Sequence, residues 1–408
     1  MVGAGRTYTM VATIPNTDTI RRGMRRIVVC ILVAFIAFSA TCSSRDVKRS
    51  AQEEQYFTDL SNFLAGIPVP QQSRFWEATQ HKFYAEHIKF MNNFWDRVMN
   101  DTVNRMVPWR EAHMVRGFEK YPAFYPLSGA DFINFYTIIP DAPEYVMVAM
   151  EHAGPAPEPL KLNPQQLRSG LAALERVVFT YGYFNYFASR TMQKEMSNIS
   201  ITGATPVIMI FMARLGLRVT FVEPVGINND GALEGINGAG AFANGVKPEY
   251  RGIRIEFRAP KDTKTRQLVY ISMKMMNDNV QPTTPSGRFF ARYQNTRTMM
   301  KSAVYLCHYD KYKGVKEFIL GKSIMLIQDD SGIPFRYFNN AQWDIKLFGV
   351  YKPYFKLEGC HVYQQPELFE SYKNNSSFPL PFHFGYGSVM GRERSTLILA
   401  VRKQDKRA

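Results

Sequence analysis

Gly252-Ile-Arg-Ile-Glu-Phe-Arg258 alternates apolar and polar residues along its whole length. This period of two is typical of a β-strand that buries one face. A second apolar segment, Leu268–Met275, follows after a polar loop and is expected to pair with the first strand as a hairpin. The pattern therefore predicts an antiparallel sheet in this half of the chain.

Further elements are expected on both sides of this hairpin. The segments expected to form strands are Tyr145–Met150, Leu217–Val222, Ser323–Gln328, Pro334–Asn339, Asp344–Tyr351 and Thr396–Arg402. Two segments are expected to be helical, Thr298–Leu306 and Val315–Leu320. Phe132–Ile139 fits either a short helix or a strand. The sheet is thus predicted to be large.

Helices are expected mainly ahead of and between these strands. The longest begins at Ser73, places apolar residues such as Tyr84 and Met91 on one face, and is expected to end before Pro108. Asn163-Pro164 and Thr205-Pro206 open two more helices. The sequence therefore predicts an α+β fold, with amphipathic helices packed on a largely antiparallel sheet.

One large domain is expected over residues 50–408. If it has a subdomain boundary, the boundary falls near 153–162, where the chain is rich in proline. Residues 42–49 are a short polar tether before the domain. Residues 1–41 are interpreted as a signal peptide, whose true start is either Met1 or Met24.

The leader decides the expected location of the protein. Arg25-Arg26 precede fourteen uncharged residues, Ile27–Ala40, which are too few to span a bilayer core comfortably. A basic start, a short apolar run and small residues at the end are typical of a secretory signal. We therefore expect an exported protein.

The end of the leader favours lipid attachment. Ser39-Ala-Thr41 is a small-residue box in front of Cys42, as in bacterial lipoprotein signals, although Ser39 and Thr41 depart from the usual residues. Cys42 is the predicted lipid-attachment site, and the anchored protein would lie on the periplasmic side or at the cell surface. Ordinary signal cleavage nearby and an uncleaved anchor are the two alternatives.

The charge suggests anionic partners. The chain has a net charge of +15, of which residues 1–41 contribute five arginines and one aspartate. The remaining excess is scattered, which fits a solvated surface or weak attraction to an anionic envelope polymer. No nucleic-acid-binding motif accompanies it, so a nucleic-acid partner is disfavoured. A protein partner and the membrane, through the lipid, are the other expected partners.

Two cysteines remain after Cys30 in the leader and the lipid site at Cys42. Cys307 and Cys360 would close a loop of about 50 residues if they pair in an oxidising compartment. Two buried free thiols are the alternative. No CxxC, zinc spacing or cofactor motif is present, so no metal and no cofactor are expected.

The sharpest local pattern is Gln328-Asp-Asp-Ser-Gly-Ile-Pro334 between two apolar segments. Asp329, Asp330 and Ser331 have the groups needed to activate a nucleophile, with His308 or His383 as a base. The same residues are what a tight turn requires, and the turn is the preferred interpretation.

Two other loops contain short motifs that are candidates for a functional site. Ser128-Gly-Ala-Asp131 places a hydroxyl and a carboxylate together, in a cleft or in a turn that leads into Phe132. Gly238-Ala-Gly-Ala-Phe-Ala243 matches part of a dinucleotide fingerprint, but no strand runs into it and Pro248 follows closely. The second loop is therefore interpreted as a flexible glycine-rich segment.

Three motifs together carry a resemblance: Phe124-Tyr-Pro-Leu-Ser-Gly-Ala-Asp-Phe132, Gln328-Asp-Asp-Ser-Gly-Ile-Pro334 and Leu380-Pro-Phe-His-Phe-Gly-Tyr386. With the lipoprotein-type leader, the chain resembles a family of uncharacterised bacterial cell-envelope lipoproteins. The resemblance implies an envelope location and a single long domain. It implies no activity and no site residues.

Two functions follow as hypotheses. The first is an envelope-anchored lipoprotein that binds an envelope component or an assembly partner without catalysis. The second is a hydrolase of a cell-envelope polymer that uses Asp329, Asp330 and Ser331 with a histidine. The lack of a catalytic signature favours the first.

Overall fold

The computed structural model describes residues 49–185, 201–352, 363–387 and 395–403. The expected signal peptide, almost all of the tether, Cys42 and Cys360 lie outside these residues. The chain from Ala51 onward forms one compact unit, which runs without division through the proline-rich segment 153–162. No helix in the described part of the chain combines the length and the apolar character needed to cross a bilayer.

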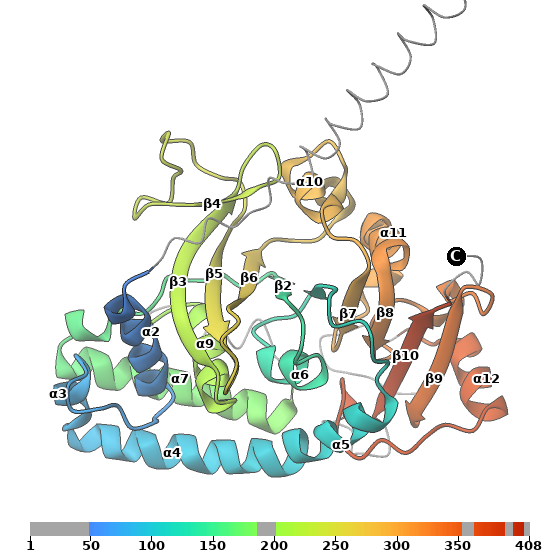
Figure 1. Ribbon diagram of the computed structural model, residues 1–408. Helices are drawn as coiled ribbons and strands as arrows, with labels where there is room; N and C mark the ends of the chain where they lie inside the picture. Colours follow the sequence, from blue (N-terminus) through green and yellow to red (C-terminus); the bar gives the residue numbers. More distant parts are fainter. Residues whose placement is uncertain (1–48, 186–200, 353–362, 388–394, 404–408) are drawn as a thin grey trace, which may run out of the picture. The chain divides into compact units, whose positions relative to one another are not determined.

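A mixed sheet forms the centre of this unit (Figure 1). Among the described residues it has ten strands, in the spatial order β4 (Leu233–Gly235), β3 (Arg218–Ile227), β5 (Arg251–Arg258), β6 (Arg266–Ser272), β2 (Glu144–Ala149), β1 (Ala123–Pro126), β7 (Thr296–Met300), β8 (Ser323–Gln328), β10 (Thr396–Arg402) and β9 (Trp343–Gly349). Five of the neighbouring pairs are antiparallel and four are parallel.

The α+β fold with a mostly antiparallel sheet is thus confirmed. β5 and β6 form the expected antiparallel hairpin, with Ile253 opposite Tyr270. The four parallel pairs join β6, β2, β1, β7 and β8 at the centre, where both faces of the sheet are covered. Parallel strands need such cover because their connections run over the sheet faces.

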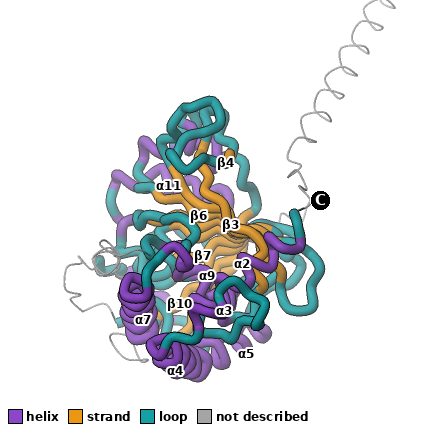
Figure 2. Tube along the Cα trace, turned by 90° about the vertical axis from the view of Figure 1, so that its left-hand side faces the viewer, coloured by secondary structure: helices purple, strands orange, loops and turns teal. Residues whose placement is uncertain are grey.

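Helices cover both faces of the sheet. One face packs against α2 (Ala51–Leu64), α4 (Lys82–Val98), α6 (Phe132–Ile138), α7 (Pro164–Phe184) and α9 (Ala204–Arg214). The other packs against α10 (Pro285–Ala291) and α11 (Lys313–Lys322). α12 (Pro366–Asn374) lies beside β9, and α4 and α7 lie side by side (Figure 2).

The alternation within single strands explains this layering. In β1, Tyr125 belongs to the core under α6 and α7, whereas Phe124 belongs to the core under α10 and α11. In β2, Met147 and Val148 divide in the same way. Each central strand therefore supplies side chains to two hydrophobic cores, which is why its sequence reads as a continuous apolar run.

Three local predictions are wrong. Thr298–Leu306 is not a helix, because its first residues belong to the buried strand β7 and a loop follows. Pro334–Asn339 is not a strand and contains a 3₁₀ turn, Phe335–Tyr337. Segment 396–402 does not close the sheet, because β9 lies outside it.

The long helix also differs from the prediction. It is divided into α3 (Trp76–Thr79), α4, a π-helical turn at Met99–Val103 and α5 (Asn104–His113), which contains Pro108. Proline lacks an amide hydrogen and clashes with the preceding turn. The π turn directly before α5 is the kind of irregularity at which helices accommodate such a residue.

Candidate functional site

The parallel centre of the sheet creates a crevice between β1 and β7. β1 is followed along the chain by β2 on one side, whereas β7 is followed by β8 on the other. The connections therefore leave the two neighbouring strands in opposite directions. In sheets of this kind, ligands bind outside the carboxyl ends of the strands at such a switch point.

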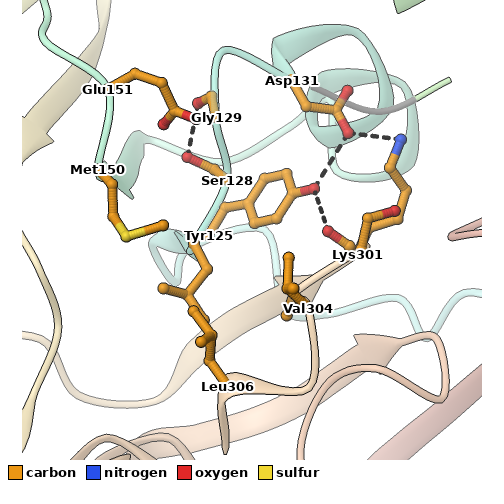
Figure 3. A pocket seen from close by; sticks show the side chains of 12 residues that line it. Tyr125, Ser128, Gly129, Asp131, Met150, Glu151, Lys301, Val304 and Leu306 are labelled. Atoms are coloured by element: carbon orange, nitrogen blue, oxygen red, sulfur yellow. Dashed lines mark hydrogen bonds and ion pairs between the residues drawn. The ribbon is translucent and has the colours of Figure 1, made fainter. Parts of the chain in front are cut away.

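A cavity of about 40 Å³ lies at this position (Figure 3). Its lining comes from the carboxyl end of β1 and the loops after β1, β2 and β7, which contribute Tyr125, Ser128, Glu151 and Lys301 among others. A buried water needs about 10–15 Å³ measured in this way, so the cavity holds about three. It can therefore enclose one terminal group of a ligand and not a whole sugar or nucleotide.

A buried ion pair forms the floor of the cavity. Lys301 Nζ lies 2.7 Å from Asp131 Oδ2, and the two side chains are only 1% and 2% exposed. The hydroxyl of Tyr125 donates to the same carboxylate oxygen at 3.1 Å, and that of Tyr181 donates to Asp131 Oδ1 at 2.7 Å. The Lys301 ammonium also donates to the backbone carbonyl of Asn185. The network joins the loop after β1 to β7 and α7.

The protonation of this network follows from its burial. Burial lowers the pKa of Lys301, and the adjacent Asp131 carboxylate opposes that change. Burial and the same carboxylate raise the pKa values of Tyr125 and Tyr181, so both phenols stay protonated and donate. The floor is thus a compensated pair surrounded by neutral donors, and it presents little net charge to a ligand.

The walls and the mouth differ in polarity. Ser302 lines the cavity, and its buried Oγ has no hydrogen-bond partner among the described residues. Glu151, which is 3% exposed, adds a carboxylate to the lining. At the mouth, Met150 and Val304 are 41% and 42% exposed. A buried polar atom without a partner requires an explanation, and a bound ligand group provides one.

The backbone around the cavity is strained. Leu127, Ser302, Val304 and Tyr305 have φ between 53° and 58°, in the left-handed region. Each such residue costs about 1–2 kcal/mol unless it is glycine, and β-branched Val304 fits this region worst. Strain of this kind clusters at binding and catalytic sites, because surrounding contacts hold it in place.

The predicted residues Asp329, Asp330 and Ser331 lie beside this cavity and do not line it. Ser331 Oγ donates to Asp329 Oδ1 at 2.6 Å and accepts from the amide of Ala303 at 2.8 Å. Asp329 Oδ2 accepts from the amide of Ser302 at 3.1 Å. The turn after β8 therefore holds the strained loop after β7, which does line the cavity.

The two carboxyl groups have unusual acidity. Burial and the neighbouring Asp330 raise the pKa of Asp329 to about 7. Burial also raises the pKa of Asp330, although the Tyr305 hydroxyl donates to its Oδ2 at 2.5 Å. The turn thus holds a proton near neutral pH on a group that is wholly buried.

The predicted histidines occupy different places. His308 packs its ring against that of Tyr305 with centroids 5.3 Å apart, and burial lowers its pKa to about 4. His383 accepts a hydrogen bond from Asn185 through its backbone carbonyl at 2.9 Å. Because Ser331 donates its proton to Asp329, these contacts do not form a serine–histidine–aspartate relay.

Cys307 is the remaining predicted residue within the described part of the chain, and it does not line the cavity. Cys307 is a free, fully buried thiol whose pKa burial raises to about 12, which makes it unreactive.

Within the described ranges, no group of three or more His, Cys, Asp or Glu side chains could hold a metal ion.

The sequence predicts one part of this site, Ser128 and Asp131, but not the other, Lys301 and Tyr125. Ser128 and Asp131 were expected together in a cleft or a turn, and they lie at the cavity. Lys301 was missed because its segment was predicted to be helical. Its signal was a lone lysine after the apolar run Met299-Met300. Tyr125 belongs to the short strand β1, which is buried throughout and has no period of two to mark it in the sequence.

Comparison with known proteins adds no identification. No family model, no curated protein and no solved structure matches this chain.

Proposed function

We propose that this chain is an exported protein, anchored in the bacterial envelope through a lipid on Cys42, that binds an amphipathic envelope component without transforming it. The ligand site is the cavity between the loops after β1, β2 and β7. The observation that carries the proposal is the position of this cavity at the switch point of the sheet, with a Ser302 hydroxyl in its wall that has no hydrogen-bond partner among the described residues.

The lining indicates the chemistry of the ligand. Asp131 compensates the Lys301 charge, and the lining contains the Ser302 hydroxyl, whose oxygen has no hydrogen-bond partner among the described residues. This oxygen favours a hydrogen-bond donor, such as an amine or a hydroxyl, as the enclosed end. The exposed side chains of Met150 and Val304 favour an apolar portion just outside. A lipid ethanolamine head group or the amine of a peptidoglycan stem peptide fits this description.

The contacts of Ser331 count against the alternative, a hydrolase of an envelope polymer. Its hydroxyl is wholly buried and both of its hydrogen bonds are used within the fold. A nucleophile needs access to substrate and an adjacent base. The binding function requires neither, so it is the better supported of the two.

Substituting Met150 with tryptophan should block the site. The side chain is exposed at the mouth, so a larger ring covers the opening without disturbing the core. We expect glycerophosphoethanolamine or a stem tripeptide to bind the parent protein, as measured by titration calorimetry, and to bind Met150→Trp at least tenfold more weakly.

Leu160→Trp is the matched control, because Leu160 is 48% exposed in the 3₁₀ turn Pro159–Lys161 and does not line the cavity. It should bind like the parent. Equal binding by Met150→Trp and the parent would show that the ligand enters elsewhere. Turnover of either probe would favour the hydrolase.

The envelope location has its own test. Cys42→Ser removes the sulfur to which acyl chains attach, and each buried CH₂ contributes about 0.8 kcal/mol to membrane binding. We expect the variant to move from the membrane fraction to the soluble fraction on cell fractionation. Cys307→Ser, which changes a buried thiol far from the leader in sequence, should stay in the membrane fraction. A Cys42→Ser variant that remains membrane-bound would support an uncleaved anchor.

A further inference from the structure

β9 forms one edge of the sheet and, among the described residues, is open along part of its length. On one side it pairs with β10 from Trp343 to Gly349. A groove of about 310 Å³ follows the other side, between β9 and residues that include Ser371 of α12 and Asn375 just after it. An open edge strand presents unpaired backbone groups and is a template for another strand.

Hydrogen bonds within the chain define the ends of the open part. Phe378 donates its amide to the carbonyl of Leu347, and the amide of Gly349 donates to the carbonyl of Phe378, both at 2.9 Å. At the other end, the amide of Trp343 donates to the carbonyl of Asn339 at 2.9 Å. The odd-numbered residues therefore direct their backbone groups away from β10.

The open groups are symmetric about one residue. Four groups between the two closed ends have no backbone partner among the described residues: the carbonyl of Trp343, the amide and carbonyl of Ile345, and the amide of Leu347. If a second copy of the strand approaches antiparallel, with Ile345 opposite Ile345, these groups meet as four N–H···O bonds. The groups already used within the chain fall just outside this set.

The side chains have the same symmetry. In this register Trp343 lies opposite Leu347 of the second copy, and Asp344 lies opposite Lys346 of the second copy, twice. Asp344 and Lys346 are both exposed and line the groove. They would form a non-hydrogen-bonded pair, in which Cα atoms approach to about 4.5 Å and opposite charges attract.

Sliding the register by two residues is unfavourable. In one direction Lys346 would lie opposite Lys346, and in the other Asp344 would lie opposite Asp344. Like charges directly opposite each other destabilise a strand pair. The edge is thus complementary to itself in a single register.

We propose that two copies of this chain associate through β9, with a twofold axis at Ile345, so that the sheet continues from one copy into the other. An exposed apolar side chain on the same edge agrees with an interface, since Phe378, which lines the groove, is 44% exposed. The proposal is independent of the ligand function described above.

Charge reversal tests the pairing. The full-length chain in detergent micelles should sediment as a dimer at equilibrium. Asp344→Lys and Lys346→Asp should each weaken the dimer at least tenfold, because each places two like-charged pairs in the interface. The double variant Asp344→Lys/Lys346→Asp should restore the parent affinity, because it exchanges the charges without changing their complementarity.

Two controls keep the outcome clear. Lys313→Glu reverses a charge on the exposed face of α11 and should leave the dimer unchanged. Far-ultraviolet circular dichroism spectra of the folded proteins should be equal for all variants, since the changed residues are exposed. Three results would overturn the proposal. These are a monomer at every concentration, a dimer whose affinity neither single reversal lowers, and a double variant whose dimer affinity remains low. Strand addition by another protein to a monomeric chain would also overturn it.

Discussion

Lys301→Met is expected to lower the free energy of unfolding by about 3–5 kcal/mol, because it leaves the Asp131 carboxylate buried without its cation. Asp131→Asn should cost a similar amount by leaving the ammonium unpaired. The double variant should recover much of the loss, since neither charge then remains. Urea denaturation of the four proteins gives the coupling energy directly.

Lys313→Met is the control for this cycle. Lys313 is 69% exposed and lies 3.8 Å from Glu317, so its loss should change stability by no more than about 0.5 kcal/mol. If Lys301→Met cost as little as this control, the pair would not hold the loop after β1 to β7. The cavity would then lack a fixed floor.

Asp330→Asn is expected to change how stability depends on pH. Asp329 has a pKa near 7 in the folded protein and about 3.9 when unfolded. Between these values the folded state holds a proton that the unfolded state has lost. Asp329 therefore makes the free energy of unfolding fall as pH rises from about 4 to 7, by at most about 1.4 kcal/mol per pH unit. Above pH 7 its effect is constant.

His308 acts in the opposite direction. Its folded pKa of about 4 lies below the value of about 6.5 for free histidine, so it makes stability rise with pH over the same range. His308 is present in both the parent and the variant, so its contribution cancels in the comparison. The variant lacks both the charge of Asp330 and the titration of Asp330 itself, whose pKa burial also raises. Asp330→Asn removes a neighbouring charge that raises the Asp329 pKa. The decline between pH 4 and 7 should therefore be shallower in the variant.

Urea midpoints at half-unit steps from pH 4.5 to 8 measure this difference. Asp310→Asn, at an exposed position, should track the parent at every pH. Parallel curves for Asp330→Asn and the parent would mean that the two buried carboxyl groups do not interact. The raised pKa of Asp329 would then be due to burial alone.

The hairpin of β5 and β6 could be predicted because alternation marks a half-buried strand. The parallel centre could not. β1 has four residues and ends in Pro126, and the five residues of β7 are all buried. A short run that is buried on both faces has no period of two, so it cannot be distinguished from a turn or a helix by pattern.

The candidate site was predictable to the same extent. The sequence predicts that Ser128 and Asp131 lie together, because a hydroxyl and a carboxylate follow each other closely in it. Their partner Lys301 is 170 residues further on, and only the pairing of β1 with β7 brings it to Asp131. The turn residues after β8 were recognised as a turn, but their role in holding the loop after β7 required the fold.

The most direct test of the cavity as a ligand site is methyl NMR on protein labelled at methionine. The full-length chain in detergent is titrated with glycerophosphoethanolamine and with a stem tripeptide. For at least one probe, the Met150 methyl signal should shift in a saturable manner, whereas that of Met91, a buried residue of α4 that does not line the cavity, should not. Saturable shifts at other methionines with Met150 unchanged, or no saturable shift with either probe, would contradict the account.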